Sequence, residues 1–235
     1  MTRAEARPAC PAGHVEGLQT MVQATISTTA ADSTTGRTSQ AELNAFVCDS
    51  LPPQGCWGDE HYLWLTDRTR RLVEFTDGYV ELLPMPTVEH QAILQFLNRL
   101  FDAHLAPLGG FVLFAGLRVR VREGKFREPD LAALRSRSDP RNEPRYWLGA
   151  DVVAEVVSPD DPARDLIAKP ADYAEAGIPE YWIVDPRVEK VTVLALAGGT
   201  YVEHGVFSRG DTATSALLDG FAVDVTALFD FGKGQ

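Results

Sequence analysis

The sequence predicts a mixed α/β fold in which helices flank a mixed β-sheet. Three observations carry this prediction. Short segments that alternate apolar and polar residues between 61 and 83 indicate an antiparallel β meander, residues 87–110 show helical periodicity, and DVVAEVV at 151–157 has the continuous apolar character of a central strand. A chain of 235 residues that mixes these elements favours one folded α/β domain.

Residues 1–58 are expected to form a mostly disordered N-terminal extension, and residues 59–235 the folded domain. The stretch from 1 to about 36 is rich in Ala, Thr, Ser, Pro and Gly without periodicity, so it cannot bury enough apolar surface to offset the entropy of ordering. A short helix is expected at 39–47, where a serine is followed three residues later by a glutamate and LPPQG ends the pattern.

The meander and the first long helix have clear boundaries. HYLWLTD, RLVEFTD and YVELL supply the strands, and the pair Asp77 and Gly78 is typical of a tight hairpin turn. In the helix at 87–110, Thr87 is a suitable N-cap and two glycines follow the last turn. Its apolar residues at helical spacing are Ile93, Leu94, Leu97, Leu100, Phe101 and Leu105.

Strands dominate the remainder of the chain. A helix at 162–177 is expected to kink near Pro170 and to end at Gly177, and a short helix is expected near VTALF. The predicted strands are 111–122, 128–134, 151–157, 179–186, 190–196 and 200–207. The sheet should therefore be mixed, with buried central strands.

Composition restricts the class of protein. The formal net charge of −11 would repel a polyanion at long range, so binding to nucleic acid requires a local basic patch. The three cysteines, Cys10, Cys48 and Cys56, lack metal-ligand spacing and fit a reducing cytoplasm better than a disulfide scaffold. Since no apolar run approaches the roughly 20 residues of a membrane helix, we expect a cytoplasmic protein without a membrane partner.

Glu155 is unusual because it interrupts an otherwise apolar strand. A buried, unpaired carboxylate is costly, so a cation or a metal should lie beside it. Asp130 is expected on a neighbouring strand, and Lys169 on the helix that follows. Two adjacent carboxylates repel each other unless a divalent cation lies between them, which predicts a Mg²⁺ (or Mn²⁺) site at Asp130 and Glu155 where Lys169 orients or activates a water.

A structural interpretation of the same residues stays open. Asp130 could cap a strand, Glu155 could pair with Arg118 or Arg120, and Lys169 could face water. Spacing alone does not decide between this interpretation and a metal site, because patterns of carboxylates with a lysine are frequent.

A basic strand precedes Asp130. Arg118, Arg120 and Arg122 alternate with valines, so their guanidinium groups should project from one face of the strand. Their closeness to Asp130 in the sequence predicts contacts with a phosphate backbone, although an amphipathic surface strand would show the same pattern.

Several of these segments together resemble one known family. REPDLAAL, DVVAEVVSP, the following lysine and tyrosine, and AGIPEYWIVDP resemble the Uma-two family of restriction endonucleases in the PD-(D/E)XK nuclease superfamily, over about residues 60–230. The resemblance implies a restriction-endonuclease-like core and metal-dependent cleavage of DNA. It assigns Asp130 to the PD motif, Glu155 to the second acidic ligand and Glu89 to an additional acidic position. Val157 stands where the superfamily has lysine, so Lys169 is the candidate to replace that lysine.

Other polar residues near these motifs have weaker assignments. His90 could shuttle a proton or contact phosphate, but it neighbours Glu89, and adjacent helix positions point about 100° apart, so both rarely serve one site. Tyr173, one helical turn after the lysine, is expected mainly to pack. Glu74 and Glu81 are expected on a solvated face of the first hairpin.

The leading functional hypothesis is a Mg²⁺-dependent endonuclease that hydrolyses DNA phosphodiester bonds. A catalytically inactive nuclease-fold module for binding or regulation is the alternative, favoured by Val157 and the acidic charge. A hydrolase of small phosphoesters is a third hypothesis, since it would not need the basic strand. An apolar sheet edge would be a liability in a sheet of this size, so a homodimer is also expected.

Overall fold

The computed structural model describes residues 51–159 and 161–234. The chain divides into two compact units, Met1–Arg70 with Phe75–Glu81, and Arg71–Glu74 with Leu82–Gln235. The expected N-terminal tail and the helix at 39–47 lie outside the described residues. The two units are described in turn below.

The first unit contains a helix where the sequence predicted a strand. HYLWLTD belongs to α3 (Asp59–Thr66), so the prediction of a strand there was wrong. Two acidic residues, Asp59 and Glu60, occupy the first turn of α3, where their negative charge interacts favourably with the helix dipole. Tyr62 packs against Phe75 with ring centroids 5.4 Å apart. Burial of one side of the segment therefore outweighs its alternating pattern.

The predicted hairpin turn is confirmed. β1 (Val73–Thr76) and β2 (Tyr79–Leu82) flank Asp77 and Gly78, whose φ angles are 47° and 96°. A side chain at Gly78 would also place its Cβ 2.5 Å from the carbonyl oxygen of Gly55, so only glycine fits this position. Cys56 is disulfide-bonded, although the cysteine content favoured a reducing cytoplasm over a disulfide scaffold.

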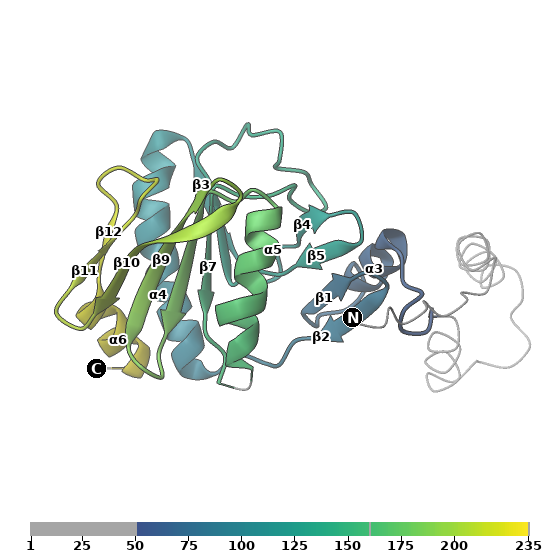
Figure 1. The fold of residues 1–235 in the computed structure, drawn as a ribbon, viewed down its shortest axis with the longest axis horizontal. Helices are drawn as coiled ribbons and strands as arrows, with labels where there is room; N and C mark the ends of the chain where they lie inside the picture. Colours follow the sequence, from purple (N-terminus) through teal and green to yellow (C-terminus); the bar gives the residue numbers. More distant parts are fainter. Residues whose placement is uncertain (1–50, 160, 235) are drawn as a thin grey trace, which may run out of the picture. The chain divides into compact units, whose positions relative to one another are not determined.

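The second unit is built on a six-stranded mixed sheet, as predicted (Figure 1). Its strand order is β10-β9-β8-β7-β6-β3, in which β7 and β8 are parallel and the other neighbours are antiparallel. The strands are β3 (Phe111–Phe114), β6 (Leu131–Leu134), β7 (Val152–Val156), β8 (Glu180–Asp185), β9 (Lys190–Ala197) and β10 (Thr200–Ser208).

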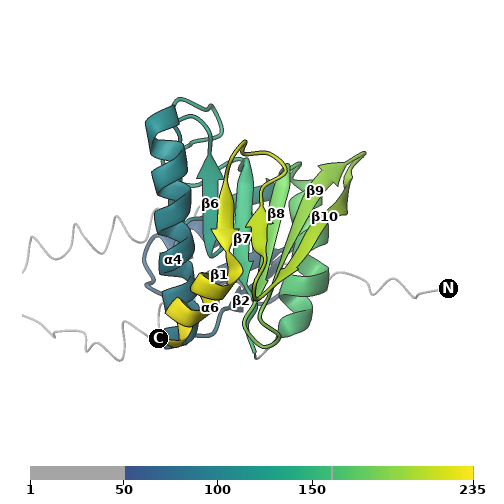
Figure 2. The ribbon, with the colours of Figure 1, turned by 90° about the vertical axis from the view of Figure 1, so that its left-hand side faces the viewer.

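Helices cover both faces of this sheet (Figure 2). α4 (Val88–Leu105) and α6 (Val225–Lys233) pack on one face against residues such as Ala154 and Trp182. α5 (Lys169–Glu175) packs on the other face, where Tyr173 meets Val153 and Tyr181. Alternate residues of the buried central strands therefore serve two apolar cores, which explains the continuous apolar run of β7.

The long helix α4 lies where it was predicted, with the predicted N-cap and the predicted apolar face. Thr87 Oγ1 accepts a hydrogen bond from the backbone N–H of His90 at 3.1 Å, which caps the first turn of α4. The predicted apolar face is buried except for Leu100, which is half-buried. A short 3₁₀ turn (Ala106–Leu108) follows, and Gly109 ends it with a φ of 86°.

The predicted boundaries of two strands were wrong. The segment 111–122 is split into β3 and β4 (Val119–Arg122), which belong to different sheets, because Gly116 adopts a φ of 97° between them. The segment 128–134 contributes only β6, and its predecessor β5 (Lys125–Arg127) pairs antiparallel with β4. We call β4 and β5 together the basic hairpin.

The segment that leads to Lys169 departs from a regular helix. A π-helical turn, η2 (Arg164–Ala168), precedes α5, and Pro170 lies in the first turn of α5, where proline needs no hydrogen-bond donor. The irregularity expected at Pro170 thus lies just before it. Gly177 ends the segment with a φ of 69°, as predicted.

The chain ends with elements that the sequence indicated only in part. β11 (Thr212–Thr214) and β12 (Ala222–Asp224) form a small antiparallel sheet that was not predicted. α6 extends the short helix expected near VTALF, and Asp224 caps it by accepting from the N–H of Ala227 at 2.9 Å. None of the helices in the described ranges is long and apolar enough to cross a bilayer.

Candidate active site

Asp130, in the bend before β6, lies beside Glu155 of β7. Asp130 directly precedes β6, whose first residue, Leu131, pairs antiparallel with Ala154 of β7, so Asp130 lies next to Glu155. The backbone N–H of Asp130 donates to Glu155 Oε2 at 3.3 Å, and that of Val156 donates to Asp130 Oδ2 at 2.8 Å. The sheet register therefore brings together the two carboxylates singled out in the sequence.

Glu155 is buried, with 1% of its surface exposed. Lys169 Nζ lies 2.9 Å from its Oε2 atom, and the hydroxyl of Tyr173 donates to its Oε1 atom. The cation in contact with Glu155 is therefore Lys169, whereas the structural interpretation expected an arginine such as Arg118 or Arg120. Tyr173, expected mainly to pack, also holds the carboxylate.

The structural interpretation expected Lys169 to face water, and this was wrong. The side chain of Lys169 is buried between two carboxylates. Its Nζ atom lies 3.0 Å from Asp165 Oδ1 in addition to its contact with Glu155. The sequence reasoning did not identify Asp165. The available signal was its position four residues before Lys169, the spacing of an ion pair along a helix.

At the start of α4 the structure brings His90, rather than Glu89, to the carboxylates. His90 Nε2 lies 3.0 Å from Asp130 Oδ2. A Cβ built at Gly232 would lie 3.7 Å from Glu89 Cγ, so Glu89 runs along α6, and among the described residues no hydrogen bond or ion pair joins it to Asp130, Glu155 or Lys169. Adjacent positions on a helix diverge, and only one of them reaches the site.

The surroundings of Glu155 and Asp130 shift the pKa values of the two carboxyl groups in opposite directions. Burial raises the pKa of Glu155 well above its usual value, and the charges of Asp130 and Asp165 act in the same direction, although Lys169 opposes them. Burial also acts to raise the pKa of Asp130, but the hydrogen bond from His90 and the charge of Lys169 outweigh it and lower that pKa. The same site therefore shifts the two carboxyl pKa values in opposite directions, that of Asp130 downwards and that of Glu155 upwards.

Lys169 keeps its charge despite burial. Burial by itself would lower the pKa of Lys169, but the surrounding carboxylates, with Glu155 first, outweigh it and raise the pKa. An ammonium has no lone pair with which to take a proton from water. Lys169 is therefore suited to stabilise negative charge and to orient a water, rather than to act as a general base.

The donor set fits a hard divalent cation that is shared with a substrate. Asp130 and Glu155 supply carboxylate oxygens, while no group of three or more His, Cys, Asp and Glu side chains in the described part of the chain is arranged to hold a metal. Mg²⁺ commonly uses one or two carboxylates and completes its shell with water and substrate phosphate. Asp130 and Glu155 would hold such an ion, and a closed protein cage does not fit.

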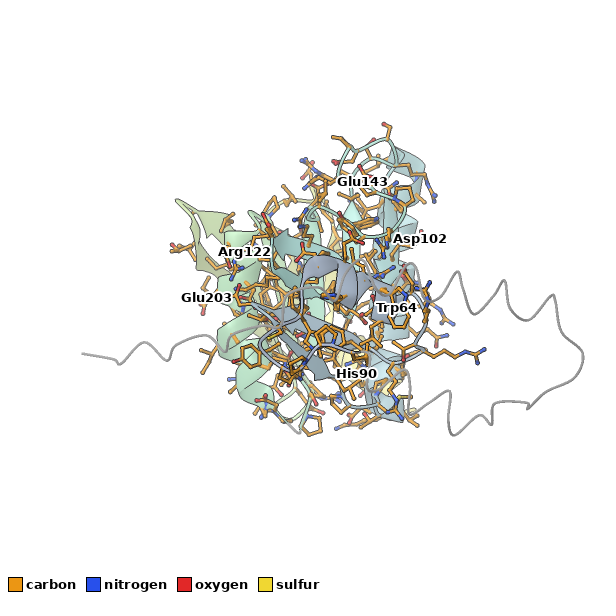
Figure 3. The ribbon with its side chains drawn as sticks, turned by 90° about the vertical axis from the view of Figure 1, so that its right-hand side faces the viewer. Trp64, His90, Asp102, Arg122, Glu143 and Glu203 are labelled. Carbon is orange, nitrogen blue, oxygen red and sulfur yellow. The ribbon has the colours of Figure 1, made fainter. Side chains whose placement is uncertain are left out.

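The arginines expected to contact DNA lie in and beside the basic hairpin. Arg118 precedes β4, and Arg120 and Arg122 alternate on it with the buried Val119 and Val121, as the sequence predicted for one amphipathic strand. In Figure 3 the labelled Arg122 lies beside α5, and its Nε atom donates to Glu175 Oε1 at 2.8 Å.

Carboxylates of α5 also compensate the other cations of the basic hairpin. Lys125 Nζ lies 2.7 Å from Asp172 Oδ1 and 2.9 Å from Glu175 Oε2. Arg127 Nη2 lies 2.7 Å from Asp172 Oδ2 and its Nε atom 3.7 Å from Glu74, which is buried rather than solvated. The hairpin therefore anchors the helix that carries Lys169 and Tyr173.

Comparisons with known proteins agree with this fold. A crystal structure of a "putative nuclease belonging to DUF820" from Anabaena variabilis ATCC 29413 matches with a TM-score of 0.62 and 19% sequence identity, covering 75% of this chain and 99% of that one. This likeness confirms the mixed α/β fold, with helices flanking a mixed sheet, that the sequence predicted. No curated protein matched.

A family model covers most of the described chain. Residues 59–226 match the model of the Uma2 family, whose description is "Putative restriction endonuclease". The matched range contains Asp130 and Glu155, together with the helical segment that bears Lys169. The resemblance noted in the sequence is thereby confirmed, and the chain belongs to the Uma2 family.

Proposed function

We propose that this chain is a Mg²⁺- or Mn²⁺-dependent endonuclease that hydrolyses DNA phosphodiester bonds. The observation that carries the proposal is the placement of Glu155 beside Asp130, with the charged Lys169 in contact with Glu155. Residues 59–235 are taken as the nuclease domain, which the family match over 59–226 supports. The cytoplasm is the proposed location, although the disulfide at Cys56 weakens the argument from cysteine content.

Each residue of the site has a distinct proposed role. Asp130 and Glu155 hold the divalent cation, which when bound polarises a phosphoryl oxygen and lowers the pKa of a water. Lys169 offsets negative charge that develops at the phosphorus and helps to orient the attacking water. His90 fixes the orientation of Asp130 through their 3.0 Å contact. Glu89 stays a proposed accessory acid, without a direct contact that supports it.

Contacts to DNA through Arg118, Arg120 and Arg122 also stay proposals. The contact of Arg122 with Glu175 means that a phosphate would have to replace a carboxylate there. Arg122 is 35% exposed and Glu175 41% exposed at the side chain, so such an exchange occurs at the surface and costs little desolvation. The partner exchange is therefore energetically accessible.

A catalytically inactive binding module is the second candidate, and a specific observation favours it. The buried Lys169 already satisfies the charge of Glu155, so the cluster is stable as a structural ion-pair network without a metal. Such a module would keep DNA binding and lack cleavage.

A homodimer is proposed through the β3 edge of the large sheet. β3 ends the strand order, Leu113 and Phe114 are 37% and 56% exposed, and residues 109–117 contain no charged residue. An uncharged edge strand lacks the usual protection against pairing with another strand. Phe114→Lys should convert a dimer to a monomer in analytical ultracentrifugation, and a wild-type chain that sediments as a monomer would contradict the proposal.

The test of activity is cleavage of supercoiled plasmid by the full chain. Nicking should require Mg²⁺ or Mn²⁺, stop with EDTA, and be lost in Glu155→Gln and Asp130→Asn. Glu203→Gln, an exposed position on β10, is the matched control and should cleave at the wild-type rate. Metal-independent DNA binding without nicking would favour the inactive module, and nicking that persists in Glu155→Gln would exclude the proposed site.

A further inference from the structure

Both carboxylate oxygens of Asp165 have partners, although the proposed function assigns this residue no role. It lies in the π-helical turn η2, and its side chain is 4% exposed. Its Oδ2 atom accepts from the backbone N–H of Ser158 at 3.0 Å, its Oδ1 atom lies 3.0 Å from Lys169 Nζ, and its carbonyl oxygen accepts from Tyr181 at 2.9 Å. Both carboxylate oxygens of Asp165 and its backbone carbonyl are thus held by other groups.

Lys169 needs a second counter-ion in the proposed nuclease. A buried ammonium is strongly destabilising without a partner, and the side chain of Lys169 is only 6% exposed. One of its two carboxylates, Glu155, is also a proposed metal ligand, and its Oε2 atom is the one that Lys169 contacts. When Glu155 turns to a divalent cation, Asp165 is the carboxylate left within ion-pair distance of Lys169.

We infer that Asp165 is a positioning residue that holds the Lys169 ammonium in the site while Glu155 binds a divalent cation. This inference rests on the proposed metal-dependent function. It also accounts for Val157, which stands where the superfamily has lysine. A lysine at 157 would be placed by strand β7, whereas Lys169 projects on a flexible stem from the start of α5. Asp165 supplies the missing restraint, because Ser158 ties it to the end of β7.

Mg²⁺ binding by the full chain tests this inference without DNA or cleavage. The readout is the Mg²⁺ concentration at half of the maximal rise in Tm. Asp165→Asn should raise this midpoint by about tenfold, the size of one lost hydrogen bond to a charged group. Asp161→Asn makes the same charge change at an exposed position of the same segment and should leave the midpoint unchanged.

A double-mutant cycle separates positioning from simple attraction between Asp165 and the cation. In a Lys169→Met background no ammonium needs a counter-ion, so Asp165→Asn should raise the midpoint by a much smaller factor. An equal factor in both backgrounds, or no change in Asp165→Asn, overturns the inference alone. A wild-type chain without any Mg²⁺-dependent shift overturns the proposed function as well.

A second variant covers the case in which Asp165→Asn does not fold. Asp165→Glu keeps a negative charge for Lys169 and should leave the Mg²⁺ midpoint within about threefold of wild type. A folded Asp165→Glu protein whose midpoint rises as far as that expected for the Asn variant would overturn the inference. Rescue by the charge-conserving change supports it.

Discussion

Lys169→Met tests whether one ammonium compensates the buried carboxylates of the site. Lys169 Nζ lies 2.9 Å from Glu155 and 3.0 Å from Asp165, and all three side chains are almost fully buried. Methionine fits a similar volume but leaves both carboxylates without their cation. Removal of one partner from a buried ion pair typically costs about 3–5 kcal/mol. For a domain of this size that loss corresponds to a decrease in Tm of about 6–20 °C.

The loss should depend on pH in a defined direction. Because the pKa of Lys169 is raised, its stabilising contribution is complete below the usual value of 10.5 and is lost only as pH rises through the raised value. The pKa of Glu155 is raised as well, so a proton can replace the missing cation as pH falls. The difference in Tm between wild type and Lys169→Met should therefore shrink from pH 8 to pH 5.

Thermal unfolding followed by circular dichroism at pH 5, 6, 7 and 8 in metal-free buffer would measure this dependence. Lys190→Met, on the exposed end of β9, is the matched control and should change Tm little. A variant that is as stable as wild type at pH 8, or one whose deficit is the same at every pH, would refute the argument that Lys169 compensates buried charge.

Three further predictions concern buried carboxylates and their donors. Burial raises the pKa of Glu128 to about 7, so wild-type stability should fall relative to Glu128→Gln by about 3 kcal/mol between pH 4.5 and 7, as measured by urea unfolding. The Oε2 atom of the fully buried Glu180 accepts from the backbone N–H groups of Ala216 and Leu217, and its Oε1 atom accepts from the indole N–H of Trp182. Glu180→Gln should lower stability at pH 7 by about 3 kcal/mol because an amide can accept at only one of these two atoms. Tyr173→Phe should cost about 1–3 kcal/mol in the same assay, since one oxygen of Glu155 loses its donor; unchanged unfolding curves would contradict each expectation.

Periodicity was sufficient to predict the elements that are long or buried on both faces. α4 carries its apolar residues at helical spacing and has its cap in the sequence, and β7 reads as an uninterrupted apolar strand. The pair Asp130 and Glu155 followed from placing two carboxylates on neighbouring strands. The same reasoning failed at α3, because an eight-residue segment with two buried residues carries too weak a pattern to separate a helix from a strand.

Long-range contacts determined what the sequence could not specify. The choice between Glu89 and His90 depends on the rotation of α4 against the sheet, which no local pattern reveals. Asp165 reaches Lys169 through a π-helical turn, and sequence periodicity does not indicate where such a turn occurs. The partners of Arg122 lie more than 50 residues further along the chain, on α5.

The ion pairs between the basic hairpin and α5 would affect how the proposed binding of DNA depends on salt. A cation that neutralises a phosphate normally drives binding through the release of condensed counterions, which makes affinity fall steeply with salt. Arg122, Lys125 and Arg127 instead already pair with carboxylates of α5, which a phosphate would compete with or displace. A displaced carboxylate must then recruit a cation from solution, which offsets the ion released by the DNA. Binding through this surface would therefore depend on salt less than the number of its basic residues suggests.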